Sequence, residues 1–208
     1  MPTPERTSLD EIVQAGRDIL ESAGVAGLTM QAVADRVGVR APSLYKRVRG
    51  RDDLVRLVVE ATVRDLGERL AALSPDPSRG TDVPHPAPAA GLHAGAPGAD
   101  PRQEFAELAR AFRAFAHARP VGCQLIFAAK AATPSTDVLA EAVAPVLRVT
   151  AALAGERHAL GGARTVTAWA YGFVSMELAG AFRLGGDVDE AYELGIAWLA
   201  DALGKAAS

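Results

Sequence analysis

Apolar residues recur along most of this chain every three or four positions, which is the spacing of one face of an α-helix. The first such stripe predicts a helix that Ser8 caps and that Gly24 ends. No stretch sustains the alternation of apolar and polar residues that marks a half-buried strand. The pattern therefore predicts an all-α fold.

Two short helical patterns follow between residues 27 and 51. Thr29 is a suitable N-cap for the first, and Gly38 ends it in a position that favours a left-handed residue. Pro42 fits the first turn of the second, where its missing N–H costs nothing, and Gly50 ends it. Two short helices joined by a tight turn containing Gly form a helix-turn-helix. Residues 1–50 are thus expected to be a three-helix domain.

Later patterns divide the rest of the chain. A long helix is expected over 51–73 as a connector. Residues 74–101 contain seven prolines and four glycines and few large apolar residues, which favours a flexible segment. Residues 102–208 are expected to form a helical domain. Its predicted helices span 102–118, 120 to before Pro134, 136–154 and 158–184, and a last helix is capped by Asp187 or Asp189.

Composition narrows the class of protein. The chain has 208 residues, of which 49% are hydrophobic and 23% charged, and this is typical of a globular protein with a real core. No run of eighteen apolar residues indicates a membrane span, and the first residues lack an apolar signal core, so a cytoplasmic location is expected. A single cysteine, Cys123, excludes an internal disulfide and a cysteine-based metal cluster. No metal or cofactor is expected.

Positive charge is concentrated around the helix-turn-helix. From Arg36 to Arg56 there are seven Lys or Arg residues and two acids, although the whole chain has a net charge of −3. A basic patch on a helix-turn-helix is the electrostatic signature of DNA binding. The alternative is an ordinary helical hairpin with a solvated charged face.

The segment GLTMQAVADRVGVRAPSLYKRVRGRDDL resembles the DNA-binding region of TetR-type repressors, and the resemblance covers roughly residues 8–72. It implies a DNA-contacting surface whose roles divide by residue type. Side chains expected to reach the major groove or its edges are those of Arg40, Ser43, Tyr45, Lys46 and Arg47. Ala41 is small enough to approach a thymine methyl, and Pro42 belongs to the same DNA-contacting set. Thr29, Arg49 and Arg51 are expected to hold phosphates.

The segments FRAFAHARPVGCQLIF and TAWAYGFVSMELAGAF resemble a ligand-binding domain of many TetR-type regulators, over roughly residues 102–205. That domain carries a Trp-His-Gly signature, and here Tyr171 stands before Gly172 in place of the histidine. The resemblance implies that the helices at 160–184 and 189–203 form a four-helix homodimer interface. Their surplus of apolar residues is consistent with that role.

A small molecule is expected to bind among the helices between 102 and 184. The candidate lining residues are Phe112, Phe115, Cys123, Gln124, Phe127, Trp169, Tyr171, Phe173 and Met176, with Gln124 and Tyr171 as polar anchors. Each of them could instead be ordinary core. A mostly apolar cavity favours a hydrophobic ligand.

These observations predict a ligand-responsive transcriptional repressor that binds a palindromic DNA operator as a homodimer and is released by a hydrophobic small molecule. One alternative is an architectural nucleic-acid-binding protein without an inducer. The other is a small helical enzyme. Enzyme activity is not expected, because the chain has no Gly-rich phosphate loop, no G-x-S-x-G elbow and no His/Cys/Asp metal spacing.

Overall fold

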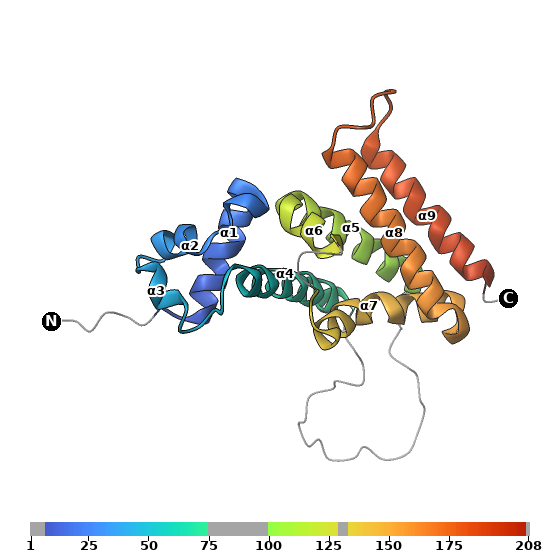
Figure 1. Cartoon of the computed structure of the whole chain (residues 1–208). Helices are drawn as coiled ribbons and strands as arrows, with labels where there is room; N and C mark the ends of the chain where they lie inside the picture. Colours follow the sequence, from blue (N-terminus) through green and yellow to red (C-terminus); the bar gives the residue numbers. More distant parts are fainter. Residues whose placement is uncertain (1–6, 75–99, 129–132, 207–208) are drawn as a thin grey trace, which may run out of the picture.

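The computed structural model describes residues 7–74, 100–128 and 133–206, and every regular element within these ranges is a helix (Figure 1). This confirms the expected all-α fold. The Pro/Gly-rich segment predicted to be flexible falls almost entirely in 75–99, outside the described residues. None of the described helices combines the length and the apolarity needed to cross a lipid bilayer.

The N-terminal head consists of α1 (Leu9–Gly27), α2 (Met30–Arg36) and α3 (Ala41–Leu44). The Ser8 hydroxyl accepts the Glu11 N–H at 3.1 Å and the Glu11 carboxylate accepts the Ser8 N–H at 2.7 Å, so a complete capping box starts α1. Gly24 breaks α1 with φ +68°, as expected, but a last helical turn follows the kink. The Thr29 hydroxyl caps α2 by accepting the Ala32 N–H at 3.1 Å.

Helix α3 is shorter than the sequence predicted. It ends at Leu44, whereas the pattern placed its end at Gly50. The N–H groups of Arg47 and Val48 both donate to the Leu44 carbonyl at 2.9 Å, so the regular ladder of one bond per residue stops there. Leu44 and Val48 are each 1% exposed, and their burial holds the turn against the head.

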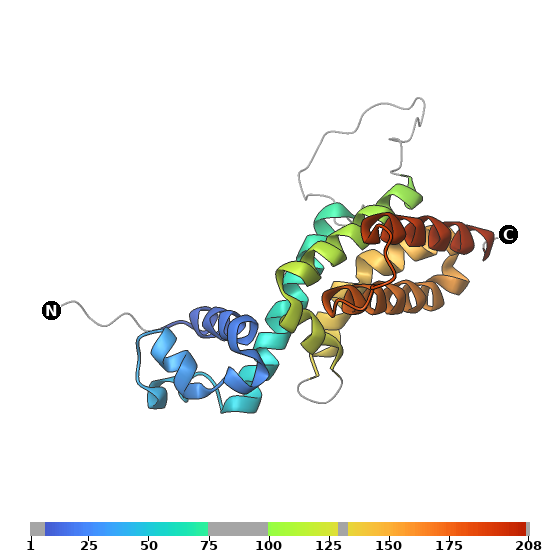
Figure 2. The ribbon, with the colours of Figure 1, turned by 90° about the horizontal axis from the view of Figure 1, so that it is seen from above.

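Helix α4 (Arg51–Leu73) has the predicted bounds and runs from the head into the C-terminal body (Figure 2). At 1.5 Å per residue its 23 residues span ~34 Å. It crosses α7 closely, because a Cβ added to Gly67 would lie 2.9 Å from the Ala142 Cα. Glycine at this position therefore allows the two backbones to approach.

The C-terminal body contains α5 (Pro101–Ala118), α6 (Pro120–Phe127), α7 (Thr136–Ala154), a 3₁₀ turn (Glu156–His158), α8 (Ala159–Leu178) and α9 (Val188–Ala206). Helices α8 and α9 lie side by side along one edge of the body in both views (Figures 1 and 2). The Ser135 hydroxyl caps α7 by accepting the Val138 N–H. Of the two caps expected for the last helix, Asp187 is the one observed, because its carboxylate accepts the N–H groups of Asp189 and Glu190.

Two predicted helix ends are wrong. Helix α6 ends at Phe127 rather than just before Pro134, and residues 129–132 lie outside the described part. Helix α8 ends at Leu178 rather than at Leu184. Gly180 adopts φ +63° and donates its N–H to the Glu177 carbonyl at 2.9 Å, which closes α8. The apolar pattern continues beyond this point because Phe182 packs against Phe173, with ring centroids 4.9 Å apart.

The molecule has two hydrophobic cores, one in the head and one in the body. The first gathers buried residues of α1 to α4, and the second gathers those of α4, α5, α7, α8 and α9. Helices α6 and α7 contribute to both, with Leu125 and Val138 in the first core and Cys123 and Val149 in the second. Helices α4, α6 and α7 therefore connect the head to the body.

Candidate functional sites

Helix α3 and the turn after it present a polar, basic face to solvent. Leu44 and Val48 point inward, which leaves their neighbours outside. Tyr45 is 57% exposed, a high value for an aromatic side chain. The exposed residues of the predicted DNA-contacting set are Arg40, Pro42, Ser43, Tyr45, Lys46, Arg47, Arg49 and Arg51, while Thr29 and Ala41 are half-buried. The structure thus brings together the residues proposed from the sequence.

Arg51 has a structural role that the sequence did not reveal. Its Nε donates to the Leu28 carbonyl at 3.0 Å and its Nη2 donates to the Val25 carbonyl at 2.6 Å. These bonds connect the start of α4 to the last turn of α1 and to the residue that follows it. Backbone carbonyls 23 and 26 residues away leave no signal in the sequence pattern. A phosphate contact through the remaining N–H groups of Arg51 stays a prediction.

One acid in the basic patch is held by the protein itself. The Asp53 carboxylate accepts the Arg49 N–H at 2.9 Å and pairs with Arg56 at 2.6 Å. The Arg49 N–H, followed by the Arg56 guanidinium, lowers the pKa of Asp53 below its ordinary value. Arg56 also donates to Glu60 at 3.0 Å. Its charge is therefore paired with acids of α4 itself and adds little to the basic face of α3 and the turn after it.

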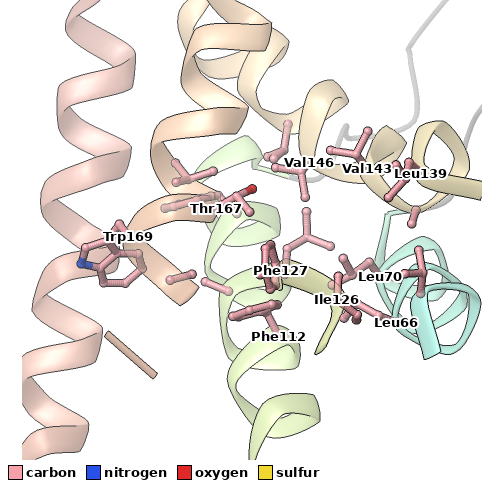
Figure 3. Close-up of a pocket in the computed structure, with 18 residues that line it drawn as sticks. Leu66, Leu70, Phe112, Ile126, Phe127, Leu139, Val143, Val146, Thr167 and Trp169 are labelled. Atoms are coloured by element: carbon pink, nitrogen blue, oxygen red, sulfur yellow. The ribbon is translucent and has the colours of Figure 1, made fainter. Parts of the chain in front are cut away.

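A cavity of about 200 Å³ lies in the body between α4, α5, α6, α7 and α8 (Figure 3). Its lining residues are Val63, Leu66, Leu70, Phe105, Leu108, Ala109, Phe112, Ile126, Phe127, Leu139, Ala142, Val143, Val146, Val149, Val166, Thr167, Trp169 and Ala170. Among these side chains, only those of Thr167 and Trp169 carry a polar atom, and none is ionisable. The site offers a desolvated hydrocarbon surface with few hydrogen bonds.

Three of the nine predicted ligand residues line this cavity, namely Phe112, Phe127 and Trp169. Tyr171 and Phe173 lie just behind it: the Tyr171 ring is 4.3 Å from that of Phe127, and Phe173 packs against Trp169 at 6.0 Å. Tyr171, the residue in place of the signature histidine, therefore supports the wall rather than forming it.

The other four predicted ligand residues lie elsewhere. Phe115 and Cys123 are buried in the core, and Gln124 and Met176 are exposed. Gln124 thus does not provide the expected polar anchor of this cavity. Burial, and then the charge of Glu21, raise the pKa of the Cys123 thiol to about 11, so it remains protonated at neutral pH. A buried, protonated thiol packs as a small hydrophobic side chain.

The sequence reasoning missed the walls contributed by α4 and α7. Leu66 and Leu70 of α4, and Val143 and Val146 of α7, point into the cavity in Figure 3. The sequence of α4 did contain an indication that this helix lines a site in the body. Its apolar stripe continues to Leu73, well beyond the part of the helix that the three-helix head can cover.

The wall nearest α9 is an aromatic stack. The Trp169 and Tyr192 rings are 5.0 Å apart and nearly parallel, at 17°. Gly195 makes room for the indole, because a Cβ there would lie 2.4 Å from the Trp169 Cζ2. The Tyr192 hydroxyl is buried and donates to the Ala109 carbonyl at 2.8 Å, and this burial raises its pKa above the ordinary value.

Arg113 ties α5 to both α8 and α9. Its guanidinium makes two hydrogen bonds to the Glu177 carboxylate, one of them 2.9 Å long, and another of 2.6 Å to Asp189. It also lies 4.9 Å from the centre of the Tyr192 ring. The hydrogen bonds from Arg113 lower the pKa of Glu177, so this carboxylate is an ion-pair partner and not a raised-pKa acid.

The outer surface of α8, α9 and the loop between them retains large apolar side chains. The exposed ones are Leu160, Met176, Phe182, Leu184, Leu194 and Trp198, and Trp198 is 65% exposed. Apolar surface gathered in one region is typical of a protein–protein interface.

Two family models match the chain. Residues 6–58 match the model of bacterial regulatory proteins of the tetR family, and residues 105–199 match the model of the tetracyclin repressor-like C-terminal domain. The chain belongs to the TetR family. The Trp-His-Gly subtype stays a prediction.

Known relatives agree with this assignment. Over 68 residues this TetR-family chain is 32% identical to the tetracycline repressor protein class E of Escherichia coli, a match that spans 33% of the chain and only 32% of that protein. Its fold resembles that of a TetR variant from Acinetobacter baumannii AYE in complex with minocycline (TM-score 0.66, 19% identity, 97% and 99% of the two chains). It also resembles BioQ with its natural double-stranded DNA operator (TM-score 0.61, 22% identity, 96% and 99%).

Proposed function

We propose that the protein is a transcriptional repressor that binds a palindromic operator as a homodimer and releases it when a neutral, apolar small molecule occupies the cavity. The observation that carries the proposal is the exposed basic face formed by α3 and the turn after it, where Leu44 and Val48 are buried while their polar neighbours face outward. Such a helix can enter the major groove of DNA. The BioQ relative was solved with its DNA operator, which supports this role.

The same face supports a division of contacts. Arg47 lies in the turn after α3 and can fork onto a guanine edge, which distinguishes base pairs. Arg49 lies two residues further, beside the start of α4, and suits a phosphate contact that fixes position without reading sequence. Two heads of a dimer would then need to lie about one helical turn apart, ~34–36 Å, on the operator.

The cavity supports a particular class of ligand. A charged group buried without a partner is strongly disfavoured, and no lining side chain is ionisable. A neutral molecule that forms at most one or two hydrogen bonds, to Thr167 or Trp169, fits this lining best. The volume of about 200 Å³ exceeds the ~150 Å³ of an engineered apolar cavity that binds benzene. An architectural DNA-binding protein would not need such a cavity.

Selection from a randomised duplex pool tests the repressor proposal directly. The unmodified protein should enrich a palindromic sequence, and its affinity should fall steeply as salt rises because bound phosphates release counterions. N-phenyl-1-naphthylamine, a neutral fluorescent probe, should bind the cavity, and Val146→Phe, which adds a ring on the cavity side, should exclude it. Failure to bind any duplex at low salt would contradict the proposal.

A further inference from the structure

Helix α6 begins without a cap of its own. Pro120 has no N–H, and Arg119, the residue before it, makes no side-chain hydrogen bond to the helix start. The next two N–H groups, those of Val121 and Gly122, both donate to the carboxylate of Glu21 at 3.1 and 2.9 Å. Glu21 belongs to α1, so the head supplies the cap of a helix in the body.

The start of α6 fits closely between two helices. A Cβ added to Gly122 would lie 2.8 Å from the Glu21 Oε1 and 3.2 Å from the Thr62 Cγ2. Thr62 is a buried residue of α4. Glycine at position 122 is therefore what allows the Glu21 carboxylate to reach both N–H groups.

The other end of α6 reaches the cavity. Ile126 and Phe127 line it, and Phe127 packs against Tyr171 of α8 and against Phe112 of α5. The helix has eight residues and is about 12 Å long. One short rigid element thus touches the cavity at its C-terminus and α1 at its N-terminus, as the position of α6 beside α1 in Figure 1 illustrates.

We propose that Glu21 is the positioning residue through which the state of the cavity is transmitted to the DNA-binding head. A molecule that displaces Phe127 moves α6, and the two hydrogen bonds to Glu21 carry this movement into α1. The negative charge matters, because a carboxylate interacts favourably with the positive end of the helix dipole and offers an oxygen to each N–H. This inference rests on the proposed function.

A double-mutant cycle tests it without knowledge of the natural ligand. The four proteins are the unmodified chain, Glu21→Gln, Phe127→Ala and the double variant, and the measurement is the Kd for the duplex selected by the unmodified protein. Phe127→Ala should change this Kd by about fivefold or more in the unmodified background. In the Glu21→Gln background the change should be within about twofold. Sites at opposite ends of α6 should otherwise be independent.

Glu11→Gln provides the matched control, since Glu11 is a capping carboxylate of the same helix α1 but does not touch α6. Its effect should add to that of Phe127→Ala. Phe127→Leu replaces Phe127→Ala if the latter does not fold, as judged by circular dichroism. Additive effects of Glu21→Gln and Phe127 substitution, or no effect of Phe127 substitution on the Kd, would overturn the inference. A failure of the unmodified protein to bind any duplex would instead overturn the proposed function.

Discussion

Arg47 and Arg49 are two residues apart, yet they should affect DNA binding differently. Arg47→Ala should cost roughly 1–3 kcal/mol on the preferred duplex and relax base preference at one position, since alanine cannot fork onto a guanine. Arg49→Ala should weaken binding about evenly on all sequences and reduce the salt dependence by about one phosphate's contribution. Titrations of specific and random duplexes at two salt concentrations measure both. Equal losses on both duplexes for the two variants would rule out the division.

Arg51 should matter for stability of the head. Arg51→Ala removes two charged hydrogen bonds to the carbonyls of Val25 and Leu28, and should lower the free energy of unfolding by about 1–3 kcal/mol. Urea denaturation followed by circular dichroism provides the measurement. Arg49→Ala serves as the control, because an exposed surface substitution usually changes stability by no more than about 0.5 kcal/mol. Equal stabilities of the two variants would show that the bonds of Arg51 contribute little.

At the residue scale, local signals could be read from the sequence and distant ones could not. Ser8 and Thr29 were identified as caps, and Asp187 as one of two candidates, because a capping oxygen meets N–H groups two or three positions away. The partners of Arg51 and Glu21 are backbone groups of distant segments. Neither the type of residue nor its spacing along the sequence predicts such a bond.

At the scale of elements, the ion pair between α5 and α8 should make stability depend on pH. The pKa of Glu177 is below its ordinary value of about 4.5 because Arg113 hydrogen-bonds the carboxylate. The stabilisation is therefore complete above that ordinary value and is lost as the pH falls through the lower, folded-state pKa. Glu177→Gln should lower the free energy of unfolding by roughly 1–3 kcal/mol at neutral pH, and the difference from the unmodified protein should shrink in acid.

Urea denaturation at about pH 7 and at about pH 3 measures this difference. Glu193→Gln is the matched control, because Glu193 and its partner Arg110 are both about half exposed, at 46% and 53% respectively. Exposed pairs contribute only ~0–1 kcal/mol. A constant difference between Glu177→Gln and the unmodified protein at both pH values would contradict the assignment.

Elements whose ends carry strong local signals had the bounds that the sequence predicted. Helices α4 and α7 begin and end as expected. Gly50 directly precedes α4, Ser135 caps the start of α7, and Gly155 directly follows its end. The ends of α3 and α8 were wrong for a shared reason. Apolar residues beyond each true end contact the protein through turns: Val48 is buried, and the partly exposed Phe182 packs against Phe173. The sequence pattern does not distinguish such a turn from a continuing helical face.

At the scale of the whole molecule, the lining of the cavity could not be predicted from the sequence alone. An apolar site in the body was predicted, and the cavity is apolar. Its lining residues could be predicted only by knowing how α4 crosses α7. That crossing depends on the contact between Gly67 and Ala142, residues 75 positions apart. Side chains such as Phe115 and Cys123 have the character of ligand residues, but packing places them in the core.

The outer surface of α8 and α9 should hold two copies of the chain together. Trp198 is 65% exposed, and a large indole on an apolar helix face is a frequent source of binding energy at the centre of an interface. Trp198→Glu should raise the dimer Kd by roughly tenfold or more, because a buried charge without a partner opposes association. Light scattering over a range of concentrations measures the dimer against the 21.6 kDa of one chain.

Leu73→Glu is the control for the dimer, because Leu73 is also an exposed apolar residue, at 39%, but lies at the end of α4. It should leave the mass unchanged. Association also bears on function, since a palindromic operator requires two heads held at a fixed spacing. Trp198→Glu should therefore weaken binding to a full palindrome far more than binding to a half-site. A single-chain mass for the unmodified protein at micromolar concentration would contradict both the proposed dimer interface and the binding of one operator by the two heads of a dimer.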